Sequence, residues 1–255
     1  WSKDTGNPVY IYRLPNVFGK WCKPNYNSVV ATFCNNIAKG LEIQVNDPEA
    51  QLNLVYIDDV VSDFIEAFKG KKESASDGYC HVKPVYKIKL KEIVAKLKSY
   101  KESRDNFLAP AVEDKFSKAM YATFVSYLDK DDFGYSLDKK TDQRGWLAEF
   151  IKSDVAGQIF ASSTKPGFTR GNHWHNTKIE KFLVLEGKAE IGFKNIKSGS
   201  VLTYNVTGSD MKVVDVPPGY LHTIKNVGES DLITLIWASE IFDPELPDTY
   251  YLEDK

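Results

Sequence analysis

Three of the chain's four histidines fall in two short segments whose spacing suits metal binding. His173 and His175 are two residues apart, so on an extended strand both side chains would point to the same face. Glu180 follows five residues later and can return on the next strand after a tight turn, and His222 comes from a distant strand after a Pro-Gly turn. Three imidazoles and a carboxylate suit Zn²⁺, Fe²⁺, Ni²⁺, Cu²⁺ or Mn²⁺. This pattern is typical of a metal centre.

The spacing around these residues also resembles a known family. Gly-x5-His-x-His-x4-Glu-x6-Gly runs from Gly167 to Gly187, and Pro-x-Gly-x2-His-x3-Asn runs from Pro217 to Asn226. Both match the motifs of the cupin family, although the glycine expected before the second motif stands farther away, at Gly208. The resemblance covers roughly residues 135 to 255. It implies a jelly-roll barrel (a double-stranded β-helix) with His173, His175, Glu180 and His222 as metal ligands.

Segments near the first motif resemble the epimerases and ketoisomerases of nucleotide-linked deoxysugars. The resemblance rests on the Arg144-Gly dipeptide with Glu149 close behind it, and on Arg170-Gly-Asn-His. It implies that Arg144, Glu149 and Arg170 contact the nucleotide or its diphosphate, and the planar fork of arginine suits phosphate oxygens. Each of the three could instead form a structural ion pair.

The chemistry of those relatives removes a proton next to a ketone, which needs a base near the ring carbon and positive charge at the ketone oxygen. Many of the relatives use a histidine as the base without a metal. Here the matching histidine, His173, is also the first cupin ligand, and a ligated imidazole cannot accept a proton. The candidates for the base are a metal-bound water, Tyr220, or a residue that the sequence does not single out.

The first half of the chain mixes strand-like runs with helical periodicity and therefore predicts an α/β architecture. Pro8–Leu14 reads as a buried strand, and Asn27 and Ser28 precede a run typical of a capped helix. Another strand is expected at 55–57, with Asp58 and Asp59 at the start of the helix that follows it. Further helices are predicted around 90–97 and 112–124.

The second half changes period, and short apolar runs separated by polar turns predict an all-β barrel or sandwich. The boundary is expected near 128–133, which gives domains at 1–130 and 131–255. The expected strands lie at 155–162, 182–185, 189–193, 201–206, 211–216 and 232–238.

Two segments of the first half resemble the extended short-chain dehydrogenase family. They are Arg-Leu-Pro-Asn16-Val-Phe-Gly and the run from Asn53 to Val61. The sequence contains no Gly-x-x-Gly-x-x-Gly, so the resemblance implies the C-terminal part of a Rossmann-type domain without its nucleotide-binding half. Asn16 would bind substrate, no cofactor-binding residue is expected in this fragment, and NADPH would bind only the full-length parent. The spacing of Tyr79 and Lys83 is interpreted as coincidence, and the catalytic Tyr-Lys pair would precede Trp1.

This order of domains resembles the bifunctional enzymes of capsular polysaccharide biosynthesis that act in the UDP-N-acetyl-L-fucosamine pathway. The resemblance implies that the cupin domain inverts C3 of a UDP-4-keto-6-deoxy-acetamido sugar and that the reductase domain then reduces the C4 ketone with NADPH. It also implies Zn²⁺ as the metal and a homodimer through the cupin domain. Two alternatives remain, a cupin dioxygenase that uses Fe²⁺ and a non-catalytic sugar-binding cupin.

Composition sets wider bounds. The 255 residues are 42% hydrophobic and 27% charged, which excludes a disordered chain or a collagen. The 33 basic and 35 acidic residues give a net charge of −2, which does not favour nucleic acid as a partner. Three scattered cysteines and no long apolar run predict a cytoplasmic protein without membrane insertion.

Overall fold

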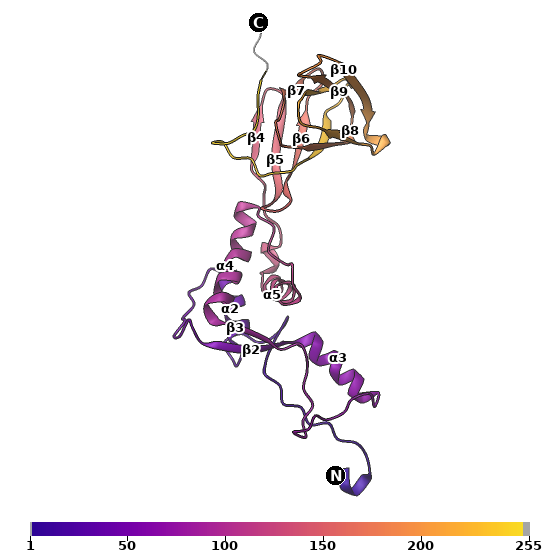
Figure 1. Ribbon diagram of the computed structural model, residues 1–255. Coiled ribbons are helices and arrows are strands. Elements are labelled where there is room, and N and C mark those ends of the chain that lie inside the picture. The colour runs from indigo at the N-terminus through magenta and orange to yellow at the C-terminus, as the bar shows by residue number, and fades with distance from the viewer. Residues whose placement is uncertain (1, 252–255) are drawn as a thin grey trace. The chain divides into compact units, whose positions relative to one another are not determined.

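The computed structural model describes residues 2–251, which divide into two compact units (Figure 1). The first unit ends at Tyr135, directly after the charged segment 128–133. The second unit holds the later described residues together with Phe107–Ala109. Backbone hydrogen bonds explain this exception, since Ala109 N donates to the carbonyl oxygen of Lys152 at 2.6 Å.

The first unit is a small mixed α/β structure with its own core. Its sheet has the order β1-β2-β3, in which β1 and β2 are parallel and β3 is antiparallel to β2. The expected cap of α2 is confirmed, because Ser28 Oγ accepts a hydrogen bond from Ala31 N at 3.3 Å. Helices α2, α4 and α5 pack together around Phe18, Leu97 and Tyr100. The elements are α1 (Ser2–Thr5), β1 (Asn16–Phe18), α2 (Val29–Ala38), β2 (Gln51–Tyr56), α3 (Ile57–Phe68), β3 (Tyr86–Lys89), α4 (Leu90–Asn106), α5 (Lys115–Val125) and the 3-10 turn η1 (Lys130–Asp132).

The prediction of a buried strand over Pro8–Leu14 is wrong. Among the described residues of this segment, Tyr12 forms an isolated bridge to Cys80, and no ladder continues from it. Val9 and Ile11 are about half exposed, at 47% and 54%. Apolar alternation marks a strand only where a neighbouring strand satisfies the backbone, and here the pairing stops after one bridge.

The second unit is built from two mainly antiparallel sheets around one apolar core. The four-stranded sheet has the order β10-β9-β12-β7, and the six-stranded sheet has the order β11-β8-β13-β6-β5-β4. Phe182, Ile191 and Ile224 fill the core from both sheets, because alternate residues along each strand face inward. The elements are β4 (Lys139–Asp142), β5 (Gly145–Ser153), β6 (Gly157–Thr164), β7 (Thr169–His173), β8 (Glu180–Glu186), β9 (Lys188–Asn195), β10 (Val201–Thr207), η2 (Gly208–Asp210), β11 (Val213–Val216), β12 (Tyr220–Asn226) and β13 (Leu232–Ala238).

The six strands expected in this half are present, and two of them begin two residues later than expected. Val155 lies in the turn before β6, and Met211 follows η2 with a left-handed backbone (φ 45°), so β11 begins only at Val213. Strands β4 and β5 were not expected, and they extend the six-stranded sheet. No helix among residues 2–251 is long and apolar enough to cross a membrane.

Candidate metal centre

The two sheets bring the four predicted ligands to one place. His173 ends β7 and pairs in register with His222 on β12, so both belong to the four-stranded sheet. Glu180 begins β8 in the other sheet, and His175 lies in the turn between β7 and β8. A side chain at Gly171 would meet the carbonyl oxygen of His222 at 2.6 Å, so glycine is required for this close approach.

The ligand atoms of His173, His175, Glu180 and His222 all lie within 4.8 Å of one another. Glu180 Oε2 is 3.2 Å from His222 Nε2 and 3.6 Å from His175 Nε2. The side chains of His175 and His222 are almost fully buried, at 2% and 1% exposed. The cluster is therefore compact, with three of its four residues buried and His173 partly exposed.

The unpaired nitrogen atoms of this cluster fit a metal ion. His175 Nδ1 lies 2.6 Å from the carbonyl oxygen of Asp248, and His222 Nδ1 lies 3.3 Å from that of Tyr220. Because a carbonyl oxygen can only accept, each Nδ1 carries the proton and each Nε2 keeps its lone pair. Both Nε2 atoms are buried without a hydrogen-bond partner in the described structure. Such atoms, aimed at one carboxylate, form a donor set for a divalent cation.

The protonation states agree with this assignment. Burial, with a contribution from His222, lowers the pKa of His173 to about 4. At neutral pH the site therefore offers a neutral imidazole at His173.

Two cavities of about 270 Å³ each adjoin the cluster. His173, Glu180 and Tyr251 line both of them, together with Leu147 and Phe160. A molecule in either cavity would therefore reach the same metal-binding side chains.

Two of the predicted substrate residues, Arg144 and Arg170, line one cavity. The Arg170 side chain is mostly buried, and its Nε donates to Thr164 Oγ1 at 2.9 Å. Burial lowers the pKa of Arg170, and the nearby Arg144 lowers it further. Asp142 pairs with Arg144 at 2.6 Å and lies 4.0 Å from Arg170, so two guanidinium groups share one carboxylate. This wall of the cavity carries excess positive charge.

The third predicted substrate residue, Glu149, lines the other cavity. Its carboxylate pairs with Lys140 at 3.1 Å and with Lys152 at 3.4 Å. Burial raises the pKa of Glu149, but the two ammonium groups bring it below its ordinary value. Glu149 is thus an ionised group at the rim of this cavity.

The two remaining predicted residues lie elsewhere. Tyr220 is partly buried on β12, its ring packs edge-on against Phe193 at 6.4 Å, and it lines neither of the two cavities at the cluster. Asn16 belongs to the first unit, where it lines a cavity of about 530 Å³ with Lys20 and Ser28.

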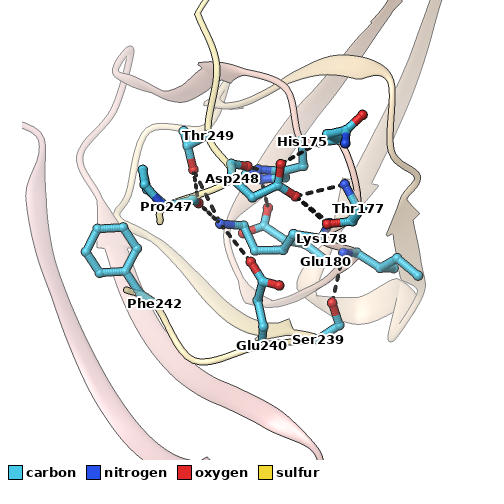
Figure 2. Close-up of polar contacts among 12 residues, drawn as sticks. His175, Thr177, Lys178, Glu180, Ser239, Glu240, Phe242, Pro247, Asp248 and Thr249 are labelled. Atoms are coloured by element: carbon cyan, nitrogen blue, oxygen red, sulfur yellow. Dashed lines mark hydrogen bonds and ion pairs between the residues drawn. The ribbon is translucent and has the colours of Figure 1, made fainter. Parts of the chain in front are cut away.

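The C-terminal segment contributes residues that the sequence did not single out (Figure 2). The carbonyl oxygen of Asp248 holds His175, and its carboxylate caps the turn at 176–178. These hydrogen bonds lower the pKa of Asp248 to about 2 although burial raises it. The ring of Tyr251 lies 5.9 Å from that of His173. The only local signal is the Pro247-Asp248 pair, which is typical of a turn and says nothing of its distant partners.

Several known proteins are similar to this chain in sequence. The polysaccharide biosynthesis C-terminal domain family matches residues 140–250. A UDP-2-acetamido-2,6-beta-L-arabino-hexul-4-ose reductase of Pseudomonas aeruginosa is 43% identical over 249 residues, which are 98% of this chain and 66% of that protein. A probable low-salt glycan biosynthesis epimerase of Haloferax volcanii is 25% identical over 124 residues, which are 44% of this chain and 80% of that protein.

Among solved structures, the capsular polysaccharide assembling protein CapF of Staphylococcus aureus matches with a TM-score of 0.95 and 47% identity, over 99% of this chain and 74% of that one. The antiparallel two-sheet barrel and its three-histidine, one-carboxylate cluster define a cupin-like protein with a candidate metal centre. At this similarity over nearly its whole length, the chain belongs to the CapF family.

Proposed function

We propose that the second unit is a metal-dependent epimerase of capsular polysaccharide biosynthesis. Its substrate would be a UDP-linked 4-keto-6-deoxy-acetamido-hexose, inverted at C3. The observation that carries the proposal is the ligand cluster at the wall shared by two cavities, one of which also presents Arg144 and Arg170. The reductase relative, named for a UDP-linked acetamido hexul-4-ose, supports this substrate class, and the epimerase relative supports the type of reaction.

The reaction would begin with removal of the C3 proton, whose bonding electrons move toward the C4 ketone oxygen to form an enolate. Return of a proton to the opposite face of C3 completes the inversion without an oxidant or a reductant. His173, His175, Glu180 and His222 would hold Zn²⁺, which supplies a Lewis acid for the ketone oxygen. Tyr251 lines both cavities beside His173 and is the phenol best placed to exchange a proton with the sugar.

The charges of the barrel suit a nucleotide diphosphate. Arg144 and Arg170 share a single carboxylate, Asp142, so one positive charge remains for the diphosphate oxygens. Arg144 is the more accessible of the two, with 41% of its side chain exposed against 14% for Arg170. Arg144 would therefore contact the diphosphate directly. Arg170 would stay hydrogen-bonded to Thr164 and would add positive charge to the cavity wall without a direct contact.

The first unit would be the C-terminal part of a Rossmann-type short-chain dehydrogenase domain. In the full-length parent this domain would reduce the C4 ketone with NADPH after the epimerisation. Asn16 and the N-terminus of α2 line its cavity of about 530 Å³ and would contact the sugar nucleotide there. The sequence lacks the Gly-rich dinucleotide loop, so this chain alone is not expected to oxidise NADPH. A homodimer through the cupin domain is also part of this proposal.

Hydrogen exchange at C3 tests the epimerase proposal. The metal-loaded chain is incubated in D₂O with a UDP-4-keto-6-deoxy-acetamido-hexose, and the C3 proton is followed by NMR. Loss of the C3 signal with inversion is expected, and the chain stripped by a chelator should leave the signal intact. Oxygen uptake by iron-loaded protein without C3 exchange would instead favour the dioxygenase alternative. Binding without exchange or oxygen uptake would favour a sugar-binding cupin.

A further inference from the structure

The C-terminal segment Pro247–Tyr251 lies against the turn that carries His175 (Figure 2). Trp174 and Tyr250 exchange two backbone hydrogen bonds of 2.9 Å, and their rings stack with centroids 4.7 Å apart. The segment is therefore fixed to the end of β7 at one point by a bridge between chain regions about 75 residues apart in sequence.

Asp248 makes the most contacts in this segment. Its Oδ1 accepts from Asn176 N at 3.0 Å, and its Oδ2 accepts from Thr177 N at 2.8 Å, Thr177 Oγ1 at 3.0 Å and Lys178 N at 2.7 Å. The residue has a left-handed backbone, with φ of 39°. This conformation turns its carbonyl oxygen to His175 Nδ1 at 2.6 Å while the carboxylate holds the turn. One residue therefore contacts the ligand and also the loop that carries it.

Lys178 fastens the segment from the other side. Its side chain is 6% exposed, and its Nζ donates to the Pro247 carbonyl oxygen at 2.6 Å and to Thr249 Oγ1 at 3.3 Å. Glu240, at 3.9 Å, is the nearest carboxylate to this ammonium group. A buried ammonium group is costly unless it is paired and hydrogen-bonded, so these contacts fix the position of Pro247 and Thr249 on either side of Asp248.

We propose that Asp248 is a positioning residue for the metal centre: it holds the turn at 176–178 and fixes His175 as the Nδ1–H tautomer, with Nε2 free for the metal. Retention of the metal thus depends on the C-terminal segment. The inference relies on the proposed function only for the presence of a metal ion. Neither of its readouts requires epimerase activity, so a failure of the epimerase proposal would leave it testable.

The test compares Asp248→Asn with Asp243→Asn in the full chain. Asparagine keeps the shape of Asp248 and tolerates a left-handed backbone, but it cannot accept all four hydrogen bonds. Asp243 lies in the same C-terminal region, but its carboxylate accepts from the backbone N–H of Glu245 at 2.8 Å and not from the turn at 176–178. Competition with a chromogenic chelator gives the Zn²⁺ dissociation constant of each protein.

Asp248→Asn should raise the Zn²⁺ dissociation constant by about 10- to 100-fold, the range found when outer partners of metal ligands are lost. Asp243→Asn should remain within about twofold of the unaltered chain. An unchanged dissociation constant in Asp248→Asn, or an equal loss in both variants, would overturn the inference.

A spectroscopic readout separates positioning from a purely structural role. In the metal-free unaltered chain, ¹⁵N NMR of the His175 ring should show a protonated Nδ1 and a bare Nε2. Asp248→Asn should show a mixture of tautomers, and Lys178→Met should shift the ring in the same direction. This measurement on the unaltered chain remains decisive if a variant fails to fold, because a protonated Nε2 there would contradict the inference.

Discussion

Replacement of Glu180 by glutamine tests whether this carboxylate is a metal ligand. Glu180 is buried at the start of β8, and its Oε2 lies within 3.6 Å of the Nε2 atoms of His175 and His222. Glutamine has nearly the same shape but carries no charge. The variant therefore removes the negative charge from the ligand set while it preserves the packing of the barrel.

The expected loss follows from the number of ligands. Four-ligand zinc sites bind with apparent free energies of about 10–16 kcal/mol, so one ligand contributes on the order of 3 kcal/mol. A loss of that size weakens Zn²⁺ binding about a hundredfold, since each 1.4 kcal/mol or so is a factor of ten. The stability of the metal-free protein should change by less than about 1 kcal/mol, because removal of a buried charge offsets the loss of its contacts.

Chelator competition at neutral pH and thermal unfolding of the metal-free chain measure the two effects. Glu149→Gln is the matched control, because Glu149 lines one of the same cavities but pairs with Lys140 and Lys152. It should leave the Zn²⁺ affinity within about twofold. If Glu180→Gln binds Zn²⁺ as tightly as the unaltered chain, or if both variants lose affinity equally, Glu180 is not a ligand.

Three further predictions concern the substrate, the proton and the fold. Arg144→Gln should raise KM for the UDP-sugar about 10- to 100-fold with little change in kcat, as loss of a charged hydrogen bond to the diphosphate would do; equal KM values would argue against this contact. Tyr251→Phe should slow C3 exchange at least about tenfold and Tyr220→Phe should not, whereas the reverse order would return Tyr220 to the role of base. Asp114→Ala should destabilise the chain by about 1 kcal/mol at pH 7, because Asp114 caps α5 by accepting from Ser117 N at 2.9 Å. The hydrogen bonds from Ser117 lower the pKa of Asp114. The contribution of Asp114 to stability is therefore complete above the unfolded pKa near 4 and is lost as pH falls through the lower folded pKa. Denaturant unfolding at pH 7 and at about pH 3.5 should show a smaller stability difference between Asp114→Ala and the unaltered chain in acid.

The candidate ligand cluster could be anticipated because its determinants are local. A single β7–β8 connection brings together His173, His175 and Glu180, which are close in sequence. Only His222 is distant from them in sequence. The cap of α2 at Ser28 and the acidic first turn of α3 at Asp58 and Asp59 were also predictable, because both features depend on residues within one turn of the helix start.

Other features depend on partners far along the chain and could not be predicted. Asp248 acts on residues about 70 positions earlier, and nothing in its neighbourhood signals them. The apolar pattern of Pro8–Leu14 was misinterpreted for the same reason, since a strand exists only where a neighbour continues the pairing. The charges shared by Arg144, Arg170 and Asp142 likewise become visible only in three dimensions.

The cluster of His173, His175, Glu180 and His222 is proposed to hold the metal that makes C3 of the keto-sugar exchangeable. The most direct test follows the C3 proton in D₂O with the chain before chelation, after chelation, and after one equivalent of Zn²⁺ is restored. We expect exchange before chelation, none after it, and exchange again once Zn²⁺ is restored. Exchange that continues at the same rate in the metal-free chain would contradict this proposal.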